Sequence, residues 1–373
     1  MRIGFDGKRV VQNFTGLGNY SRYVLNILTG YFPENPCLVY TAKIPDEEQR
    51  KKAARVEFKH PYKKKFASLW RTFSIVKDLK KDKIDVYHGL SNEIPSGLRK
   101  AGISSVVTIH DLIFLRYPQY YKFIDRTIYF YKFRYACRNA DQIIAISEQT
   151  KRDIIRYFKI PGGKVHVIYQ NCNNLFSEKF SPEGKKKIRE LYNLPARYLL
   201  NVGTVEPRKN LMLIAKALNE VPEHMHLVVV GRETHYAAEV KKYLRSEGLS
   251  ERVLFLHNVE STDLPGIYQL AELFVYPSKF EGFGIPVIEA MHCGVPVIAA
   301  TGSCLEEAGG PDSLYINPED EVQLAQTINY LLDTPLLRQT MTEKGYNYVK
   351  KFDDRSIAED LMTIYQKAIG TNA

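Results

Sequence analysis

The sequence predicts an α/β fold in which two doubly wound domains face each other across a cleft. The chain has 373 residues, too many for one typical core and enough for two domains. In both halves, short continuous apolar runs alternate with helix-length segments, a pattern typical of parallel sheets covered by helices on both faces. A polar stretch at 171–187, NCNNLFSEKFSPEGKKK, separates the halves and is expected to form the hinge.

The second half shows the alternation most clearly. Its β-rich runs are short and apolar throughout, as expected of strands buried on both faces. We expect strands at 198–203, 226–231, 253–257, 273–277, 295–300 and 314–316, and helices at 209–220, 236–247, 262–271, 286–293 and 319–332.

The first half repeats the pattern less regularly, and the chain closes with one more helix. We expect strands at 2–6, 37–41, 84–88, 105–110, 142–147 and 165–168, and helices at 17–30, 67–81, 124–138 and 148–158. The apolar positions of 356–370 recur with helical spacing. The predicted domains are therefore 1–175, 176–355, and a C-terminal helix in 356–373 that packs back on the first domain.

Composition excludes several classes of protein. Hydrophobic residues make up 45% and charged residues 25% of the chain, which is ordinary for a globular protein. No apolar run has the length of a membrane span, and the opening MRIGFDGKRVV predicts a strand rather than a signal peptide. The five cysteines are scattered, without a CxxC pair. We therefore expect a cytoplasmic protein with reduced thiols and no zinc site.

Charge is distributed unevenly along the chain. Residues 1–175 hold 31 Lys and Arg against 15 Asp and Glu, a formal charge of +16, whereas residues 176–373 hold 21 against 27, or −6. A basic first half predicts a polyanionic neighbour. Nucleic acid, anionic lipid headgroups and a phosphorylated substrate all satisfy this condition.

Two loops carry residues suited to binding phosphate. In TGLGNYSRY, Gly16 and Gly18 open a helix, where backbone N–H groups can approach an anion, although two glycines before a helix more often form only a turn. In NVGTVEPRKNL, a strand runs into Gly203, and the following loop presents Arg208 and Lys209. Adjacent cations at a helix N-terminus oppose the helix dipole, so a bound diphosphate explains them better than a solvated turn does.

A third loop places two acids around a glycine turn. In SKFEGFGIPVIEAMHCG, Glu281 and Glu289 flank Gly282-Phe283-Gly284, and Pro286 suits the first turn of a helix. Carboxylates accept hydrogen bonds from hydroxyl groups, so the pair suits a sugar and a ribose. Taken singly, Glu281 is better explained as a plain loop charge and Glu289 as a favourable anion at a helix N-terminus; as a pair around the glycine turn, the two acids are better explained by a ligand.

A fourth strand end carries a histidine. In SVVTIHDLIF, an apolar strand delivers His110-Asp111 at its carboxyl end. A lone histidine after a strand is more often structural. A neutral imidazole could also hydrogen-bond a sugar hydroxyl or polarise a reacting centre.

Together, these stretches resemble the retaining glycosyltransferases of family 4, which have the GT-B architecture of two Rossmann-like domains. EGFGIPVIE matches the E-x7-E signature of that family, GTVEPRKN its donor-phosphate loop, TIHDL its strand-end HD pair, and TGLGNYSRY its N-terminal glycine loop. Two departures stand out: Asn19 occupies a position where the family commonly has Arg, and the interdomain segment contains YQNCNN rather than PNGVD.

The resemblance implies a nucleotide diphosphate sugar as donor, held mainly by the second domain, and an acceptor on the first. Arg208 and Lys209 would neutralise the diphosphate, Glu281 and His110 would contact the donor sugar, and Glu289 would bind the ribose. The implied catalytic residues are His110, Arg208, Lys209 and Glu281; the implied donor-binding residues are Gly16, Gly18, Gly203, Arg232, Asn258, Val259, Ser278, Gly282, Phe283, Gly284, Ile285 and Glu289.

The chain contains no Asp-x-Asp metal motif. We therefore expect no metal and no cofactor, with the cations and helix N-termini stabilising the leaving diphosphate. The acceptor is expected to be a saccharide or a polyprenyl-linked saccharide. The stretch 114–135 holds ten aromatic residues interleaved with Lys and Arg, which fits an anionic membrane surface and fits a helix packed into the core equally well.

The leading functional hypothesis is transfer of a hexose, with GDP-mannose as the suggested donor, in cell-surface polysaccharide synthesis. Two alternatives stay open on the sequence alone. A nucleotide-sugar epimerase could share the fold, and the basic first half could belong to a module that binds nucleic acid or another anionic surface, although no nucleic-acid motif is present.

Overall fold

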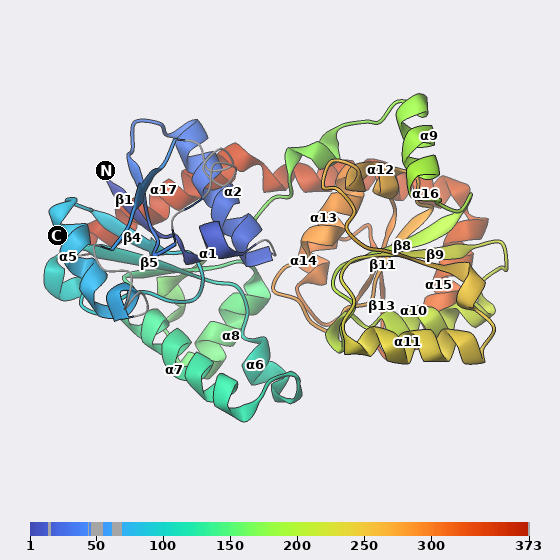
Figure 1. Ribbon diagram of the computed structural model, residues 1–373, viewed down its shortest axis with the longest axis horizontal. Helices are drawn as coiled ribbons and strands as arrows, with labels where there is room; N and C mark the ends of the chain where they lie inside the picture. The colour runs from blue at the N-terminus through green and yellow to red at the C-terminus, as the bar shows by residue number, and fades with distance from the viewer. Residues whose placement is uncertain (14–15, 44, 46–54, 62–68, 372–373) are drawn as a thin grey trace. The chain divides into compact units, whose positions relative to one another are not determined.

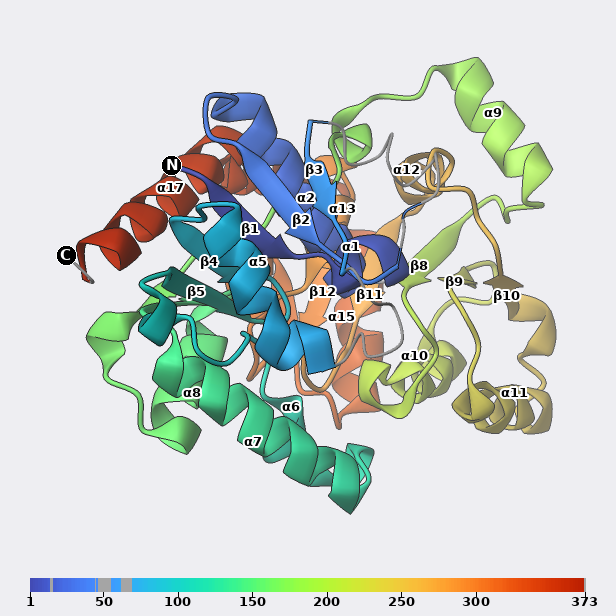
Figure 2. The same ribbon diagram turned by 60° about the vertical axis from the view of Figure 1, so that its left-hand side comes forward.

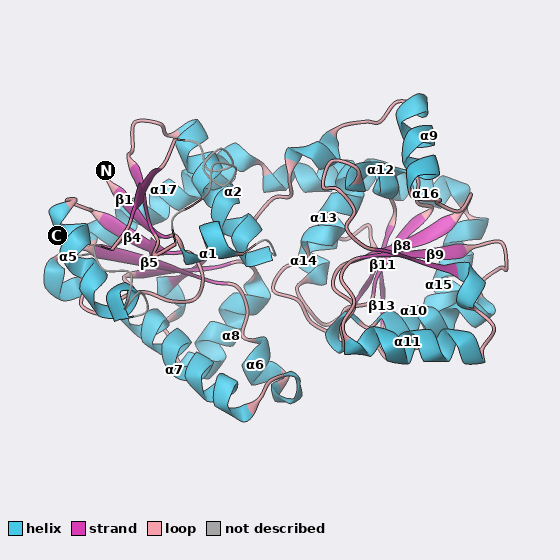
Figure 3. Cartoon of the chain, in the orientation of Figure 1, coloured by secondary structure: helices cyan, strands magenta, loops and turns pink. Residues whose placement is uncertain are grey.

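The computed structural model describes residues 1–13, 16–43, 45, 55–61 and 69–371. The chain divides into two compact units, one formed by 1–170 with 352–373 and the other by 171–351. Each unit contains one parallel sheet with helices on both faces (Figures 1 and 3), which confirms the predicted doubly wound α/β class. The sequence analysis placed the boundary after residue 175, and the first unit ends at Gln170.

Unit 1 has a seven-stranded sheet in the order β3-β2-β1-β4-β5-β6-β7, with every pairing parallel. The chain runs outward from β1 in one direction and from β4 in the other, so the topological switch point lies between these two strands. The strands are β1 (Ile3–Asp6), β2 (Cys37–Tyr40), β3 (Glu57–Lys59), β4 (Val86–Gly89), β5 (Ser104–Ile109), β6 (Gln142–Ala145) and β7 (Val165–Val167).

Helices cover both faces of this sheet (Figure 2). One face carries α2 (Gly16–Tyr31) and the C-terminal helix α17 (Asp354–Gly370); the other carries α5 (Ile75–Lys81), α7 (Phe123–Asn139) and α8 (Glu148–Phe158). Apolar side chains of β5 and β6 alternate between the faces, and the set that includes Val107 and Ile109 packs under α7 and α8. Two short helices, α1 (Lys8–Gln12) and α6 (Ile113–Arg116), follow strand ends.

The C-terminal helix α17 belongs to unit 1. Its buried face includes Leu361 and Tyr365, and the Tyr365 hydroxyl lies 2.8 Å from Nδ1 of His88 in β4. His88 Nε2 lies 2.8 Å from the Thr108 hydroxyl of β5. The helix is thus tied by a buried hydrogen-bond chain to a central strand of the sheet, at a residue 277 positions earlier in the sequence.

Unit 2 has a six-stranded parallel sheet in the order β10-β9-β8-β11-β12-β13, and its switch point lies between β8 and β11. The strands are β8 (Tyr198–Val202), β9 (His226–Val230), β10 (Val253–Leu256), β11 (Leu273–Tyr276), β12 (Val297–Ala300) and β13 (Leu314–Ile316). The helices are α9 (Pro182–Leu191), α10 (Leu211–Ala217), α11 (His235–Ser246), α12 (Leu264–Gln269), α13 (Ile285–His292), α14 (Leu305–Gly309), α15 (Glu321–Asp333) and α16 (Pro335–Val349).

Several expected elements differ from those observed. The predicted hinge at 171–187 is wrong in its second part, where helix α9 begins: Pro182 suits a first helical turn, and the Ser181 hydroxyl caps it by accepting from the Gly184 amide at 3.1 Å. The helix expected at 209–220 is interrupted because Asn210 adopts a left-handed conformation with φ of 60°. Of the helix expected at 67–81, residues 67–68 lie outside the described part, and the rest is a π-helical turn (Trp70–Ser74) followed by α5.

Two further observations concern compartment and membrane. All five cysteines are buried and free, at positions 37, 137, 172, 293 and 304. Among the described helices, none is long and apolar enough to cross a membrane.

Candidate active site

Three predicted residues meet at the switch point of unit 2. Arg208 and Lys209 lie in the loop after β8, and Glu281 lies in the loop after β11, the neighbouring strand. Arg208 Nη1 is 2.7 Å and Lys209 Nζ is 2.6 Å from the Glu281 carboxylate. The carboxyl ends of adjacent parallel strands therefore bring two cations and one anion together, where doubly wound folds bind their ligands.

Other groups hold this cluster in place. The Ser278 hydroxyl donates to Glu281 at 2.7 Å, and the Tyr276 hydroxyl donates to it at 3.0 Å. The Tyr276 ring also lies under Lys209, with Nζ 4.8 Å from the ring centroid. Across the loops, Arg208 Nη1 donates to the Phe280 carbonyl at 2.5 Å, and the Lys279 amide donates to the Arg208 carbonyl at 2.9 Å. The two loops thus form one rigid cradle.

Electrostatics keep Glu281 ionised. Burial alone would raise the pKa of this carboxyl, but the charges of Lys209 and Arg208 outweigh it and lower the pKa to about 2. Burial opposes the charged form of Arg208, and the carboxylates of Glu281 and Glu206 more than compensate, so the net effect is a raised pKa. The two cations and these two carboxylates balance formally. A diphosphate arriving here would meet cations that are already oriented.

Glycines at the ends of β8 and β9 allow this close packing of backbone. Gly203 and Gly231 have φ of 141° and 153°, a region that L side chains rarely adopt. A Cβ on Gly231 would stand 2.1 Å from the carbonyl oxygen of Gly203, and a Cβ on Gly203 would touch the Lys209 side chain at 3.5 Å. Gly231 is therefore required by close packing and by its backbone conformation, and Gly203 by its backbone conformation.

The second acid of the pair lies in a different environment. Helix α13 begins after Gly284, which has φ of 119° and provides no side-chain cap, and Pro286 lies in its first turn. Glu289 accepts a hydrogen bond from the buried Tyr268 hydroxyl at 2.9 Å. Burial raises the pKa of Glu289 to about 7, although Tyr268 and Lys209 oppose this. At neutral pH one acid of the pair is fully ionised and the other is partly protonated.

The remaining donor-binding candidates of unit 2 lie at the carboxyl ends of its strands, as the cluster does. Arg232, at the end of β9, and Asn258, at the end of β10, are both exposed at the edge of the sheet that carries Arg208. Among the described contacts, neither side chain bonds to the cluster. Val259 follows Asn258 directly. The glycine turn is formed by Gly282 and Phe283 and is followed by Ile285, and the Phe283 ring is buried.

The candidates of unit 1 lie at its own strand ends. His110 follows β5, is buried, and has Nε2 2.8 Å from the Leu90 carbonyl oxygen, so Nε2 carries the proton and donates. Burial lowers the pKa of His110 to about 4, which keeps the imidazole neutral. Tyr20 of α2 contacts the ring edge-on, with centroids 4.6 Å apart. A helix that begins at the glycine loop therefore positions this histidine.

The two glycines of that loop have different roles. A Cβ on Gly18 would stand 1.8 Å from the Asn13 carbonyl oxygen, and the Gly18 amide donates to the Asn13 side chain at 3.2 Å. Gly18 is therefore needed for packing, and its N–H is already engaged. A Cβ on Gly16 would meet nothing within 4 Å. Packing does not explain a glycine at this position.

The sequence analysis missed three residues that complete the site in unit 2. Tyr276, Glu206 and Tyr268 each bind a predicted residue directly. Tyr276 and Glu206 flank the predicted loops in sequence, so their place near the strand ends was an available signal. Tyr268 lies in α12, and only the tertiary fold brings it to Glu289.

Comparisons with known proteins agree with this arrangement. The sequence model described as "Glycosyl transferases group 1" matches residues 184–348, and the one described as "Glycosyltransferase Family 4" matches residues 22–170. The first match includes every strand of the unit 2 sheet, and the second includes every strand of the unit 1 sheet except β1. The chain belongs to glycosyltransferase family 4.

Individual relatives refine the picture of this glycosyltransferase. It is 29% identical over 287 residues to "O-antigen chain mannosyltransferase B" of Escherichia coli, which covers 75% of this chain and 74% of that protein. In structure, it resembles a glycosyltransferase from Rickettsia africae (TM-score 0.79, 18% identity, 99% and 98% of the two chains). It also resembles Anabaena Alr3699/HepE in complex with UDP (TM-score 0.77, 20% identity, 98% and 99%). These structural neighbours share the GT-B fold. Family membership favours a transferase over the epimerase and the binding module.

Proposed function

We propose that this glycosyltransferase moves a hexose from a nucleotide diphosphate sugar to a saccharide or polyprenyl-linked saccharide, with retention of anomeric configuration and without a metal ion. The observation that carries the proposal is the Arg208–Glu281–Lys209 cluster at the switch point of unit 2. It supplies two cations to a diphosphate and one carboxylate to sugar hydroxyls, which are the groups such a donor presents.

The reaction requires stabilisation of the negative charge on the leaving diphosphate. When the bond between the anomeric carbon and the β-phosphate oxygen breaks, negative charge develops on the diphosphate. Arg208 offers a planar fork of donors, and Lys209 offers a compact charge. Because the surrounding hydrogen bonds already orient both groups, little reorganisation is needed as the charge develops. In this proposal they do the work for which other transferases use a divalent ion.

Retention requires that the acceptor oxygen bond to the anomeric carbon on the face from which the diphosphate leaves. In the proposed front-face reaction, the acceptor hydroxyl forms the new glycosidic bond and its proton passes to the departing phosphate oxygen. His110 is proposed to contact the donor sugar. Its neutral, Nε2-protonated state suits a hydrogen-bonding rather than a charged role.

GDP-mannose is the proposed donor. The mannosyltransferase relative from Escherichia coli supports mannose, and the UDP complex of the Anabaena neighbour makes UDP the main competitor. The cluster recognises the diphosphate that both nucleotides share. The base must be read by other groups, for which Arg232 and Asn258, near the ends of β9 and β10, are the proposed candidates.

We also propose a place for the reaction, at the cytoplasmic face of a membrane during synthesis of a cell-surface polysaccharide, with no nucleic-acid partner. Helix α7 supports membrane contact: Phe123, Ile124 and Tyr131 are 76%, 71% and 64% exposed. Arg126 lies between Ile124 and Tyr131 in the sequence, and Lys132 and Arg134 follow Tyr131. Phe114, earlier in the same aromatic stretch, is buried in the core. Phe130 and Phe133 of α7 also pack against this core, so α7 turns one face to the core and exposes the other.

The experiment that tests this function compares Arg208→Ala and Lys209→Ala with Lys216→Ala. Lys216 is an exposed lysine of α10, and its Nζ lies 3.5 Å from the Glu321 carboxylate. We expect nucleoside diphosphate release and sugar transfer to fall by roughly 10²–10³ in kcat for the first two variants and to stay unchanged in the third. Full turnover by Arg208→Ala in folded protein would contradict the proposed role of the cluster.

A further inference from the structure

We propose that a buried chain of hydrogen-bonded side chains in unit 1, which we call the brace, fixes the plane of the His110 imidazole for sugar transfer. The brace consists of Tyr20, Thr108, His88 and Tyr365. The inference rests on the proposed function, in which His110 contacts the donor sugar. The brace residues act through His110, so they are positioning residues for the reaction.

The brace connects the C-terminal helix α17, the sheet and α2. The Tyr365 hydroxyl of α17 lies 2.8 Å from Nδ1 of His88, and Nε2 of His88 lies 2.8 Å from the Thr108 hydroxyl. The Thr108 hydroxyl also lies 3.0 Å from the Tyr20 hydroxyl of α2. Tyr20 in turn meets the His110 ring edge-on, with the ring planes at 90° and the centroids 4.6 Å apart. A continuous path therefore runs from α17 to His110.

Thr108 reaches both helices because side chains alternate along β5. Val107 and Ile109 pack into the core beside α7 and α8, so Thr108, which lies between them, points to the opposite face. That face carries α2 and α17, which lie side by side (Figure 2). The two helices are also joined directly, because the Tyr23 hydroxyl donates to Asp354 at 2.9 Å. One layer of helices therefore holds both ends of the brace.

Packing alone does not account for the polar groups of the brace. Thr108, His88 and Tyr365 are completely buried, and Tyr20 is 4% exposed. Burying a hydroxyl or an imidazole costs stability unless the group is hydrogen-bonded. Valine and phenylalanine have nearly the shapes of threonine and tyrosine and would not carry this cost. The hydroxyls and the imidazole are therefore explained by the bonds between them, which fix orientation as well as position.

His88 couples the two ends of the brace. Burial, and to a lesser degree the neighbouring His110, lowers the pKa of His88 to about 3, so its imidazole is neutral. A neutral imidazole donates from one nitrogen and accepts at the other. The direction of the bond to Tyr365 therefore sets the direction of the bond to Thr108. Removing a hydroxyl at one end changes the hydrogen bonding at the other end.

The other bonds of His110 fix only part of the residue. Its backbone amide donates to Asn92 Oδ1 at 2.9 Å, and its backbone carbonyl accepts from the Thr150 hydroxyl at 3.2 Å. Its Nε2 donates to the Leu90 carbonyl at 2.8 Å. These bonds hold the main chain and one ring atom, whereas the edge-on contact with Tyr20 limits the tilt of the ring. If Tyr20 loses its anchor, the imidazole can tilt and displace Nδ1, the nitrogen that accepts hydrogen bonds.

Histidine NMR on the full-length protein, labelled with ¹⁵N-histidine, tests this positioning directly. The nitrogen signals report which ring nitrogen carries the proton, and those of His110 are assigned by their loss in His110→Ala. The brace variants are Thr108→Val and Tyr365→Phe. The controls are Thr108→Ser, which restores the hydroxyl, and Tyr40→Phe. Tyr40 is a fully buried tyrosine of the same sheet whose hydroxyl donates to Asp82 at 2.7 Å, outside the brace.

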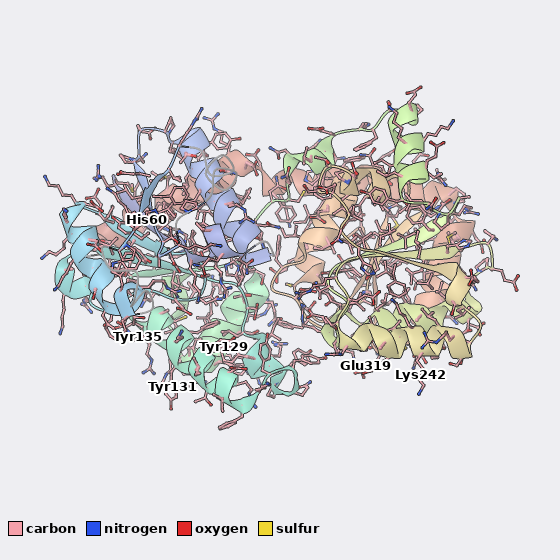
Figure 4. The ribbon with its side chains drawn as sticks, viewed as in Figure 1. His60, Tyr129, Tyr131, Tyr135, Lys242 and Glu319 are labelled. Atoms are coloured by element: carbon pink, nitrogen blue, oxygen red, sulfur yellow. The ribbon has the colours of Figure 1, made fainter. Side chains whose placement is uncertain are left out.

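His60 provides an internal reference among the nine histidines. It follows β3 (Figure 4), and its Nδ1 lies 2.8 Å from the Thr41 carbonyl oxygen, so it carries its proton on the opposite nitrogen from His110. We expect one Nε2-protonated form of His110 in the wild type and the controls. In the brace variants we expect shifted or exchange-broadened His110 signals, with those of His60 unchanged.

Wild-type His110 signals in both brace variants would overturn the proposal. Tyr365→Phe removes one hydroxyl and leaves the ring in place, so it keeps the test valid if Thr108→Val fails to fold.

Turnover separates positioning from a purely structural role. In the absence of acceptor, hydrolytic release of nucleoside diphosphate is measured with GDP-mannose and UDP-glucose, at a temperature at which every variant is folded. We expect kcat to fall roughly 10- to 100-fold in the brace variants and to stay unchanged in the controls. The KM for the donor should change by no more than about twofold, because the cluster that holds the diphosphate lies in unit 2. A lower melting temperature with wild-type kcat would overturn the proposal.

The variant His110→Ala separates this inference from the proposed function. Loss of turnover in His110→Ala with wild-type kcat in the brace variants would overturn the brace and keep the proposed role of His110. Full turnover by His110→Ala would remove that role, and with it any effect of the brace on transfer. If the wild type turns over neither nucleotide sugar, the proposed donors fail, and the NMR comparison alone decides whether the brace fixes the ring.

Discussion

Replacing Glu281 by glutamine is the most informative single change in unit 2. The substitution keeps the shape of the side chain and removes the charge that lies 2.7 Å from Arg208 and 2.6 Å from Lys209. The pKa of Glu281 is lowered from its ordinary 4.5 to about 2, a difference worth about 3 kcal/mol of folding free energy. Breaking a buried ion pair on one side costs about 3–5 kcal/mol, which agrees in size.

The sign of the pH dependence follows from the lowered pKa. The unfolded chain takes up a proton near pH 4.5, and the folded chain only near pH 2. The stabilisation by Glu281 is therefore complete above about pH 4.5 and is lost as the pH falls toward 2. We expect Glu281→Gln to lower the free energy of unfolding by about 3 kcal/mol at pH 7, measured by urea denaturation, and the deficit to shrink below pH 4.5.

Although Glu281→Gln should be less stable than the wild type, it should be stabilised more by a bound nucleoside diphosphate. Without its carboxylate, the pair of cations has an unbalanced charge that a diphosphate can neutralise. GDP or UDP should therefore raise the melting temperature of Glu281→Gln more than that of the wild type, while sugar transfer is lost.

Glu272 offers a matched control for this substitution. It precedes β11, at the opposite edge of the sheet, and pairs with Arg197 at 2.9 Å and with Arg338. Glu272→Gln should lower stability and leave the nucleotide shift unchanged. Wild-type stability of Glu281→Gln at pH 7, or loss of its nucleotide shift, would refute the assignment of Glu281 as the counter-ion of a diphosphate site.

Two further predictions concern the effect of single buried residues on the free energy of unfolding. Burial raises the pKa of Glu289 to about 7, so the folded wild type resists ionisation of this carboxyl and loses stability as the pH rises from about 4.5 to 7. Between urea titrations at pH 4 and pH 8, the free energy of unfolding of Glu289→Gln should therefore rise by up to about 3 kcal/mol relative to that of the wild type. Parallel pH profiles of the two proteins would contradict this. Gly18→Ala should lower the stability measured by thermal unfolding by at least about 2 kcal/mol, because its Cβ would meet the Asn13 carbonyl. Gly16→Ala should be neutral or should stabilise α2 by up to roughly 1 kcal/mol, because its Cβ meets nothing. Equal melting temperatures of the two variants would show that the close approach at Gly18 is wrong.

The helices and strands that are most buried were the ones that could be predicted from the sequence. The fully buried strands, such as Leu273–Tyr276, are continuous apolar runs and were predicted within one or two residues. Helix α16 was missed because its buried positions, Met341, Gly345 and Val349, form too thin a stripe to stand out. The edge strand Glu57–Lys59 was missed because it is short and polar.

The candidate site was predictable where a motif lies within one loop. Arg208, Lys209 and Glu281 were expected to share a ligand, and the structure joins them directly. The sequence could not show that Glu281 is the counter-ion of both cations, or that Tyr268 meets Glu289, because these contacts join segments tens of residues apart.

The measurement that tests the central claim most directly is a thermal-shift screen in EDTA with GDP, UDP, ADP and dTDP and their sugars. A ligand present at one hundred times its dissociation constant adds about 2.7 kcal/mol of stability. We predict that one nucleoside diphosphate and its sugar raise the melting temperature in EDTA, and that Arg208→Ala abolishes the shift. No shift with any of them, or a shift that appears only when a divalent ion is added, would contradict a metal-independent donor site at this cluster.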